Sequence, residues 1–152
     1  MVVIAIPSQS NGGLNDNLDP RFGRCQSFTF VTVNKNQIKE VKTIPNPAKQ
    51  EMGGAGIIAS QTVYNEGANE VIVGNLGPNA INSLKSLNLK AFQAPNNILT
   101  IKEVVEMHLN GKLNMLDAPN VGSHYGGMGG MGGMGGMGGG GGRGGGRGGG
   151  RF

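Results

Sequence analysis

Glycine is distributed very unevenly along this chain of 152 residues. Of its 30 glycines, 20 lie in residues 122–152 and only 10 in residues 1–121. The glycine-rich part offers few apolar groups, namely methionines, Tyr125 and Phe152, so burial cannot offset the entropy that its ordering would cost. We therefore expect a folding domain at residues 1–121 and a flexible Gly/Met/Arg-rich tail at residues 122–152, disordered when free.

The first 121 residues show apolar patterns of two kinds, and the chain is long enough there to bury a core. Short apolar or alternating runs predict strands at residues 2–6, 27–33, 38–44, 70–74 and 89–93. Apolar residues at helical spacing predict helices at residues 55–67, 77–87 and 100–111. A strand, a hairpin turning at 34–37, and then alternating helices and strands indicate an α/β fold with a mixed, three-layer sheet.

Two helix starts and one long loop stand out between these elements. Pro78 suits the first helical position of the second helix. Thr100, with Glu103 three residues later, forms a capping-box pattern at the start of the third. Residues 7–24 form a long polar loop, and loops of this length inside a compact domain are usually functional.

Composition also limits the compartment and the partners. The single Cys excludes an intramolecular disulfide, and no signal-peptide pattern or membrane-length apolar run is present, so we expect a cytoplasmic, soluble protein without a membrane partner. Residues 1–121 carry ten Lys and Arg against nine Asp and Glu, whereas the tail carries three Arg and no acid. An anionic partner should therefore meet the tail first.

The stretch DPRFGRC, which ends at Cys25, is the first candidate site. Arg21 and Arg24 lie within four residues of the thiol, and positive charge favours the metal-binding thiolate. Gly23 allows the backbone to approach a bound group closely. The alternative is that Cys25 is a small buried residue at the start of a strand, with two solvated arginines beside it.

Two glycine-containing helix starts are weaker candidates. GNLGPN, residues 74–79, follows a buried strand and opens a helix, and MGGAGII, residues 52–58, has a similar form. Backbone amides at a helix N-terminus bind anions. Neither stretch matches a dinucleotide fingerprint or a Walker loop, so a plain tight turn is the alternative.

The two histidines differ in their settings. His108 falls in the last turn of the third helix, where a cation is favoured by the helix dipole. His124 lies at the beginning of the tail, where it could ligate a metal or simply belong to a linker. No Ser/His/Asp or Cys/His arrangement is visible, so we expect a binding protein rather than an enzyme.

Four stretches of the chain resemble the dinitrogenase iron–molybdenum cofactor biosynthesis family: DPRFGRCQSFTF, GGAGIIASQTV, NEVIVGNLGPNAINSLKSLNLKAF and PNVGSHYGGMGG. This family includes small nitrogenase cofactor carriers and the C-terminal part of the radical enzyme that builds their precursor cluster. One group in it, the archaeal iron–sulfur storage proteins, has a similar tail. The resemblance implies a ribonuclease-H-like α/β fold with a five-stranded mixed sheet.

The same resemblance implies a non-catalytic protein that holds iron–sulfur or iron–molybdenum–sulfur species for storage, carriage or assembly, with Cys25 and His124 as ligand positions. An ordinary cluster takes four ligands, usually thiolates, and one chain offers a single Cys. An anionic iron sulfide brings its own sulfur and needs counter-charge. Cationic groups for it are present at Arg143, Arg147 and Arg151.

The methionine repeat of the tail adds a further donor type. Thioethers, which are weak soft ligands, recur at Met128, Met131, Met134 and Met137. We expect the tail to wrap an anionic iron-sulfide cargo, and many copies in a homo-oligomer would present a multivalent surface. Three alternatives remain open: RNA binding by the arginine–glycine segment, Cu(I) sequestration by the methionines, and a tail that is only a solubilising spacer.

Overall fold

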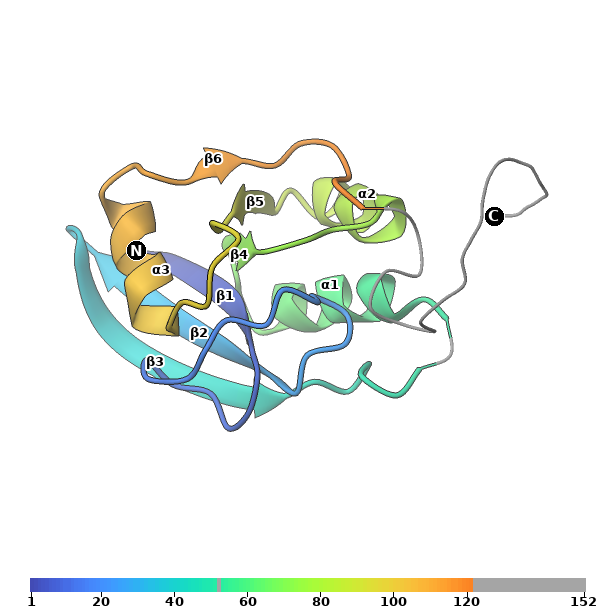
Figure 1. Cartoon of the computed structure of the whole chain (residues 1–152), viewed down its shortest axis with the longest axis horizontal. Helices are drawn as coiled ribbons and strands as arrows, with labels where there is room; N and C mark the ends of the chain where they lie inside the picture. Colours follow the sequence, from blue (N-terminus) through green and yellow to red (C-terminus); the bar gives the residue numbers. More distant parts are fainter. Residues whose placement is uncertain (52, 122–152) are drawn as a thin grey trace.

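The computed structural model describes residues 1–51 and 53–121, which form one mixed sheet with helices on both faces (Figure 1). The strands are β1 (Val2–Ser8), β2 (Ser27–Asn34), β3 (Gln37–Pro45), β4 (Glu70–Val73), β5 (Lys90–Gln93) and β6 (Asn114–Met115). The helices are α1 (Ala55–Asn65), α2 (Pro78–Ser86) and α3 (Ile101–Leu109). Met52 and residues 122–152, which are the predicted tail, lie outside the described residues.

The order of the strands is β3-β2-β1-β4-β5-β6. β1 runs antiparallel to β2 and parallel to β4, and β4 runs parallel to β5. The three parallel strands therefore end on the same side of the sheet, at Ser8, Val73 and Gln93. We call this side the carboxyl edge; in open α/β sheets it is where ligands usually bind.

Two hydrophobic clusters hold the layers together. On one face, α1 and α2 pack against the sheet through side chains such as Val63, Leu84 and Val71. On the other face, α3 packs through Val104 onto a cluster that includes Ile72. Neighbouring residues of β4 thus point to opposite faces, which explains why buried strands read as continuous apolar runs in the sequence.

The hairpin of β2 and β3 confirms the predicted turn at residues 34–37. Lys35 and Asn36 have φ angles of 54° and 62°, the left-handed values that a two-residue hairpin turn requires. The register of the two strands shifts between Thr32 and Val33, which marks a β-bulge in the hairpin. The capping box of Thr100 and Glu103 at the start of α3 is also present.

The sheet has six strands in the described part of the chain, so the expectation of five strands is wrong. The additional strand, β6, pairs Met115 with Phe92 and Asn114 with Gln93. Two residues are too few to show a periodicity, and only the return of the chain after α3 creates the pairing. The ribonuclease-H-like assignment stays a prediction.

The described helices are short. α1 is the longest of them, with 11 residues, and across residues 1–51 and 53–121 we find no helix with the length and apolarity needed to cross a membrane.

Candidate functional site

The long loop between β1 and β2 is closed around Asp16. The carboxylate of this residue accepts hydrogen bonds from the backbone amides of Ser10, Gly12 and Asn17, each at 2.8 Å. Partial burial acts to raise the pKa of Asp16, but these bonds and one from the Ser10 hydroxyl outweigh it and hold the pKa below its usual value. The loop is therefore a defined structure that presents its second half to the carboxyl edge.

A buried group of hydroxyls ties the loop to the sheet. Ser8 Oγ lies 2.8 Å from Ser27 Oγ and 3.0 Å from Thr29 Oγ1. Ser27 Oγ donates to the carbonyl oxygen of Ser10 at 2.7 Å. Because buried polar groups that bond one another are rigid, this group fixes where the loop leaves β1 and where it enters β2.

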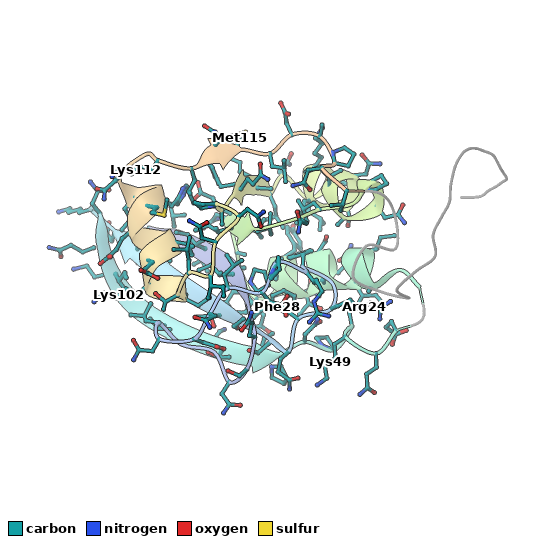
Figure 2. The ribbon with its side chains drawn as sticks, in the orientation of Figure 1. Arg24, Phe28, Lys49, Lys102, Lys112 and Met115 are labelled. Carbon is teal, nitrogen blue, oxygen red and sulfur yellow. The ribbon has the colours of Figure 1, made fainter. Side chains whose placement is uncertain are left out.

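The two arginines of the loop are engaged in local interactions. Arg21 forms an ion pair with the buried carboxylate of Asp19, with Nη2 and Oδ2 3.2 Å apart. Arg24 Nη1 donates to the backbone carbonyl oxygen of Lys49 at 3.1 Å. Figure 2 shows Arg24 and Lys49 near one another at the end of the molecule where α1 begins. Arg24 thus joins the β1–β2 loop to the segment before α1.

Cys25 is fully buried in the cluster beneath α1 and α2. Its thiol donates to the carbonyl oxygen of Phe22, with Sγ and O 3.4 Å apart. Burial, together with the negative charge of Asp19, raises the pKa of Cys25 from 9.0 to about 12. The prediction that Arg21 and Arg24 favour the thiolate is therefore wrong, because desolvation dominates. The role of Cys25 as a metal ligand stays a prediction.

The starts of α1 and α2 meet at the carboxyl edge. Gly54 and Gly77, the N-cap residues, provide no side-chain cap, and neither helix has an acidic residue in its first turn. A Cβ placed on Gly56 would lie 2.9 Å from the Cβ of Ala80, so the two first turns are in contact. We call these two first turns the paired helix starts. Each brings backbone amides and the positive end of a helix dipole.

The β1–β2 loop lies directly against the paired helix starts. A Cβ on Gly23 would lie 3.0 Å from the backbone nitrogen of Gly56, and one on Gly74 would lie 2.8 Å from Pro20. The amide of Asn75 donates to the carbonyl oxygen of Pro20 at 3.1 Å. A side chain at position 74 would force Pro20 to shift, and one at position 23 would make a tighter contact than most Cβ atoms make, so the loop is closely packed at both glycines.

The last described residues are attached to the same edge. Asn120 Oδ1 accepts from the amide of Leu76 at 2.7 Å, and Asn120 Nδ2 donates to the carbonyl oxygen of Gly74 at 3.2 Å. The amide of Asn120 also donates to the carbonyl oxygen of Leu76 at 3.0 Å. The chain therefore passes into residues 122–152 beside the loop that opens α2 (Figure 1).

A cavity of about 620 Å³ lies beside this attachment. Carboxamides from four segments line it, including Gln9, Asn75, Asn96 and Asn120, and none of the residues around it is charged. The carboxyl edge thus has a cationic side at the paired helix starts and a neutral polar side at this cavity.

Three sequence signals that lie far apart in the chain come together at this edge: Arg21, Gly23, Arg24 and Cys25 in the loop, the start of α1, and the start of α2. Other predicted site residues lie outside the described part of the chain: His124, Met128, Met131, Met134, Met137, Arg143, Arg147 and Arg151. Within residues 1–51 and 53–121, no group of three or more His, Cys, Asp or Glu is placed to hold a metal ion.

His108 is at the opposite end of the sheet. It lies in the last turn of α3 as predicted, and its Nε2 is 2.7 Å from Glu70 Oε1. The ring also packs on Phe92, with the centroids 4.3 Å apart. Sequence reasoning missed this pair because its members are 38 residues apart and no local pattern links them.

Comparison with known proteins agrees with the resemblance. Residues 2–111 match the model of the dinitrogenase iron–molybdenum cofactor family. The chain is 33% identical over 117 residues to the protein MJ0580 of Methanocaldococcus jannaschii, an alignment that covers 77% of this chain and 93% of that protein. The chain therefore belongs to the dinitrogenase iron–molybdenum cofactor family.

Solved structures give the same result. The apo form of the orange protein from Desulfovibrio gigas superposes with a TM-score of 0.72 and 30% identity, covering 80% of this chain and 98% of that one. The NMR structure of TM1290 from Thermotoga superposes with a TM-score of 0.65 and 24% identity, covering 78% and 96%. The second likeness supports the fold alone. Membership of this family associates the chain with a metal–sulfur cofactor in an accessory role.

Proposed function

We propose that this protein is a non-catalytic carrier of anionic metal–sulfur cargo, either iron sulfide or an iron–molybdenum–sulfur species, held at the carboxyl edge for storage, delivery or assembly. The observation that carries the proposal is the contact of Gly56 with Ala80, which joins two uncapped, acid-free helix starts beside the point where the chain passes into its cationic tail. Family membership supports the metal–sulfur nature of the cargo.

The paired helix starts attract an anion but do not suffice alone. Each helix end carries about half a positive charge, which stabilises a nearby anion by about 0.3–1 kcal/mol at an exposed site. Two such ends give a weak, screened site. A cargo that stays bound therefore needs further cations, and the tail provides Arg143, Arg147 and Arg151 without a single acid.

The tail is long enough to bring these cations back to the edge. Arg143 is 22 residues beyond Val121. A glycine-rich chain of that length, if flexible as its composition predicts, would have a root-mean-square span of roughly 25 Å and an extended reach of about 75 Å. The arginines can therefore reach a cargo at the paired helix starts, and they can also wrap one that is larger than the edge.

Charge, rather than thiolate ligation, is the basis of the proposed binding. Cys25 is buried and has a pKa of about 12, so it is a neutral thiol near pH 7. A sulfide-containing cargo supplies its own sulfur ligands. We propose that Gly23 and Arg24 shape the edge, and that His124 and the four tail methionines, Met128, Met131, Met134 and Met137, add soft contacts to the cargo surface.

A test needs an anionic metal–sulfur probe and a pair of isosteric charge changes. Asn79→Asp places a negative charge in the first turn of α2, and Asn65→Asp places the same charge at the far end of α1; both positions are exposed. Titration with tetrathiomolybdate under anaerobic conditions should show affinity about two- to fivefold lower for Asn79→Asp. Asn65→Asp should stay close to the unmodified protein.

One result of the same titration would contradict the proposed site. Asp in a first turn favours the helix, so lost affinity in Asn79→Asp cannot be attributed to a weakened fold. If the two variants bind the probe equally, the paired helix starts do not form part of the site. Adding salt should reduce the difference between the variants, since exposed charges are screened.

A further inference from the structure

The cavity of about 620 Å³ at the carboxyl edge lies where the connections between the strands diverge. Gln9 follows β1, and the loop that it opens leads to β2 on one side of the sheet. Gly74 follows β4, and the loop that it opens leads through α2 to β5 on the other side. Because β1 and β4 are neighbours, the cavity lies at the topological switch point, where open α/β sheets bind their ligands.

The middle one of the three parallel strands leaves a hollow at its end. Gly74, the residue after β4, has no side chain, and a Cβ placed on it would lie 2.8 Å from the Cβ of Pro20. Gln9 and Gln93 line the cavity from the ends of β1 and β5, on either side of this glycine. Neighbouring strands are about 4.8 Å apart, so the two strands that carry the glutamines are roughly 10 Å apart. The glutamines therefore bracket the hollow.

The loop after β5 forms an outer wall that is anchored at both ends. The amide of Ala94 donates to the carbonyl oxygen of Val73 at 2.8 Å, and the amide of Leu18 donates to the carbonyl oxygen of Leu99 at 3.0 Å. Between these anchors, Ile98 lines the cavity and is 85% exposed. A large apolar side chain held at the rim of a polar cavity is suited to cover the face of a bound ring.

The chemistry of the lining limits the class of ligand. Among the described residues that line the cavity none is charged, so neither an anion nor a cation meets a counter-charge there. The same described residues include no aromatic ring and no carboxylate, the groups on which sugars usually stack and bond. The lining offers carboxamides instead, for example those of Gln9, Gln93 and Asn97. A carboxamide places a donor beside an acceptor in one plane, so it forms two parallel hydrogen bonds with a ring edge that does the same.

We propose that this cavity binds a neutral nitrogen heterocycle of the adenine type, carried by a nucleoside, with Gln9 and Gln93 bonding to the edge of the ring and Ile98 covering its face. Asn and Gln side chains recognise the edge of adenine through such paired hydrogen bonds. A cavity of about 620 Å³ lies within the range of small-molecule sites. The inference goes beyond the proposed function and does not rest on it, because the ligand is neutral and the cargo is anionic.

Adenosine is the probe because it carries the base without a phosphate, so neither the paired helix starts nor the arginines of the tail attract it through charge. Calorimetric titration of the full chain with adenosine, in the absence of cargo, should give a dissociation constant below about 1 mM. Raising NaCl from about 50 to about 500 mM should change this constant by less than about twofold, because salt does not screen the binding of a neutral ligand. The same increase weakens the binding of an anionic cargo, so the two proposals fail independently.

A pair of matched variants locates the site. Gln93→Met keeps the length of the side chain but removes its donor and acceptor, so the dissociation constant should rise about fivefold or more. Gln61→Met makes the same change at an exposed position of α1 and should leave the constant unchanged. Thermal unfolding checks that both variants keep their fold.

Three results would overturn the proposal. Adenosine does not bind the full chain with a dissociation constant below about 1 mM. The two methionine variants bind adenosine equally well. Binding disappears when Arg143, Arg147 and Arg151 become Gln, which would mean that the tail, and not the cavity, holds the base.

Discussion

Gly56 and Ala80 join the first turns of α1 and α2: a Cβ on Gly56 would lie 2.9 Å from the Cβ of Ala80 and 3.4 Å from its Cα. Real Cβ atoms do not approach each other so closely, so only glycine allows this separation of the helices. The contact brings two positive helix ends to one place on the carboxyl edge. The local requirement for a small residue and the proposed anion site therefore have the same structural origin.

Gly56→Ala should force the two helix starts apart. We expect overpacking to cost about 1–3 kcal/mol, partly offset by about 1 kcal/mol from the better helix propensity of alanine. Urea unfolding measures the net decrease in the free energy of unfolding. Gly53→Ala is the control, because a Cβ there meets nothing within 4 Å. If Gly56→Ala/Ala80→Gly shows no coupling in a double-mutant cycle, the two residues do not constrain each other.

Cys25 should make the fold sensitive to alkaline pH. Its folded pKa of about 12 exceeds the ordinary 9.0, so between these values the unfolded thiol releases its proton and the folded one keeps it. Stability from this group is complete below pH 9 and is lost as the pH rises, by about 4 kcal/mol at pH 12. Urea unfolding of the natural protein and of Cys25→Ala from pH 8 to 11 measures how the free energy of unfolding depends on pH in each, and the difference between them is the contribution of the thiol.

The comparison of pH profiles does not depend on the cavity that alanine leaves. Cys25→Ala lowers stability at every pH, but its profile lacks the thiol titration. The two proteins share every other titratable group, so only the thiol differs between their profiles. Parallel profiles for the two proteins would mean that Cys25 is not a desolvated thiol.

Asp16 should contribute stability that acid removes. Its pKa is lowered in the fold, so the contribution is present above pH 3.8 and is lost as the pH falls through the folded value. Asp16→Asn removes the charge that organises Ser10 and Gly12. We expect this variant to be less stable than the natural protein at pH 7 and nearly equal to it near pH 2, as measured by thermal unfolding. An equal deficit at both pH values would show that charge is not the cause.

Asn120→Ala should release the chain end from the carboxyl edge. The variant loses the bonds to the Leu76 amide and the Gly74 carbonyl oxygen, and each such bond contributes about 0.5–1.5 kcal/mol. Hydrogen exchange should accelerate at Leu76 while β4, for example Val71, stays protected. Uniform acceleration in both places would instead indicate global destabilisation.

The sequence predicted the elements well where a pattern repeats locally. Apolar runs placed β1 and β4, and the Thr100–Glu103 spacing placed the start of α3. β6 was missed because two residues carry no period. The chemistry of Cys25 was misjudged because nearby arginines are visible in a sequence, whereas desolvation depends on the residues that the fold packs around the thiol.

In the candidate site, too, local patterns were visible in the sequence, whereas contacts between distant segments were not. The two glycine-containing helix starts were each visible as a weak signal, but their contact through Gly56 and Ala80 was not, since 24 residues separate them. The attachment of Asn120 to the Gly74–Leu76 loop also arises only in the folded chain. Local patterns give the parts of the carboxyl edge, and the parallel order of β1, β4 and β5 brings these parts together.

The most direct test of the central claim, that charge rather than thiolate ligation holds the cargo, is the content of iron and acid-labile sulfide per chain after anaerobic purification. Three full-length proteins should be compared: the natural chain, Cys25→Ala, and the triple variant in which Arg143, Arg147 and Arg151 become Gln. We expect the natural chain and Cys25→Ala to retain similar amounts, and the triple variant to retain about a tenth or less. If the triple variant keeps its iron and sulfide while Cys25→Ala loses them, the cargo is held by the thiolate and the account is wrong.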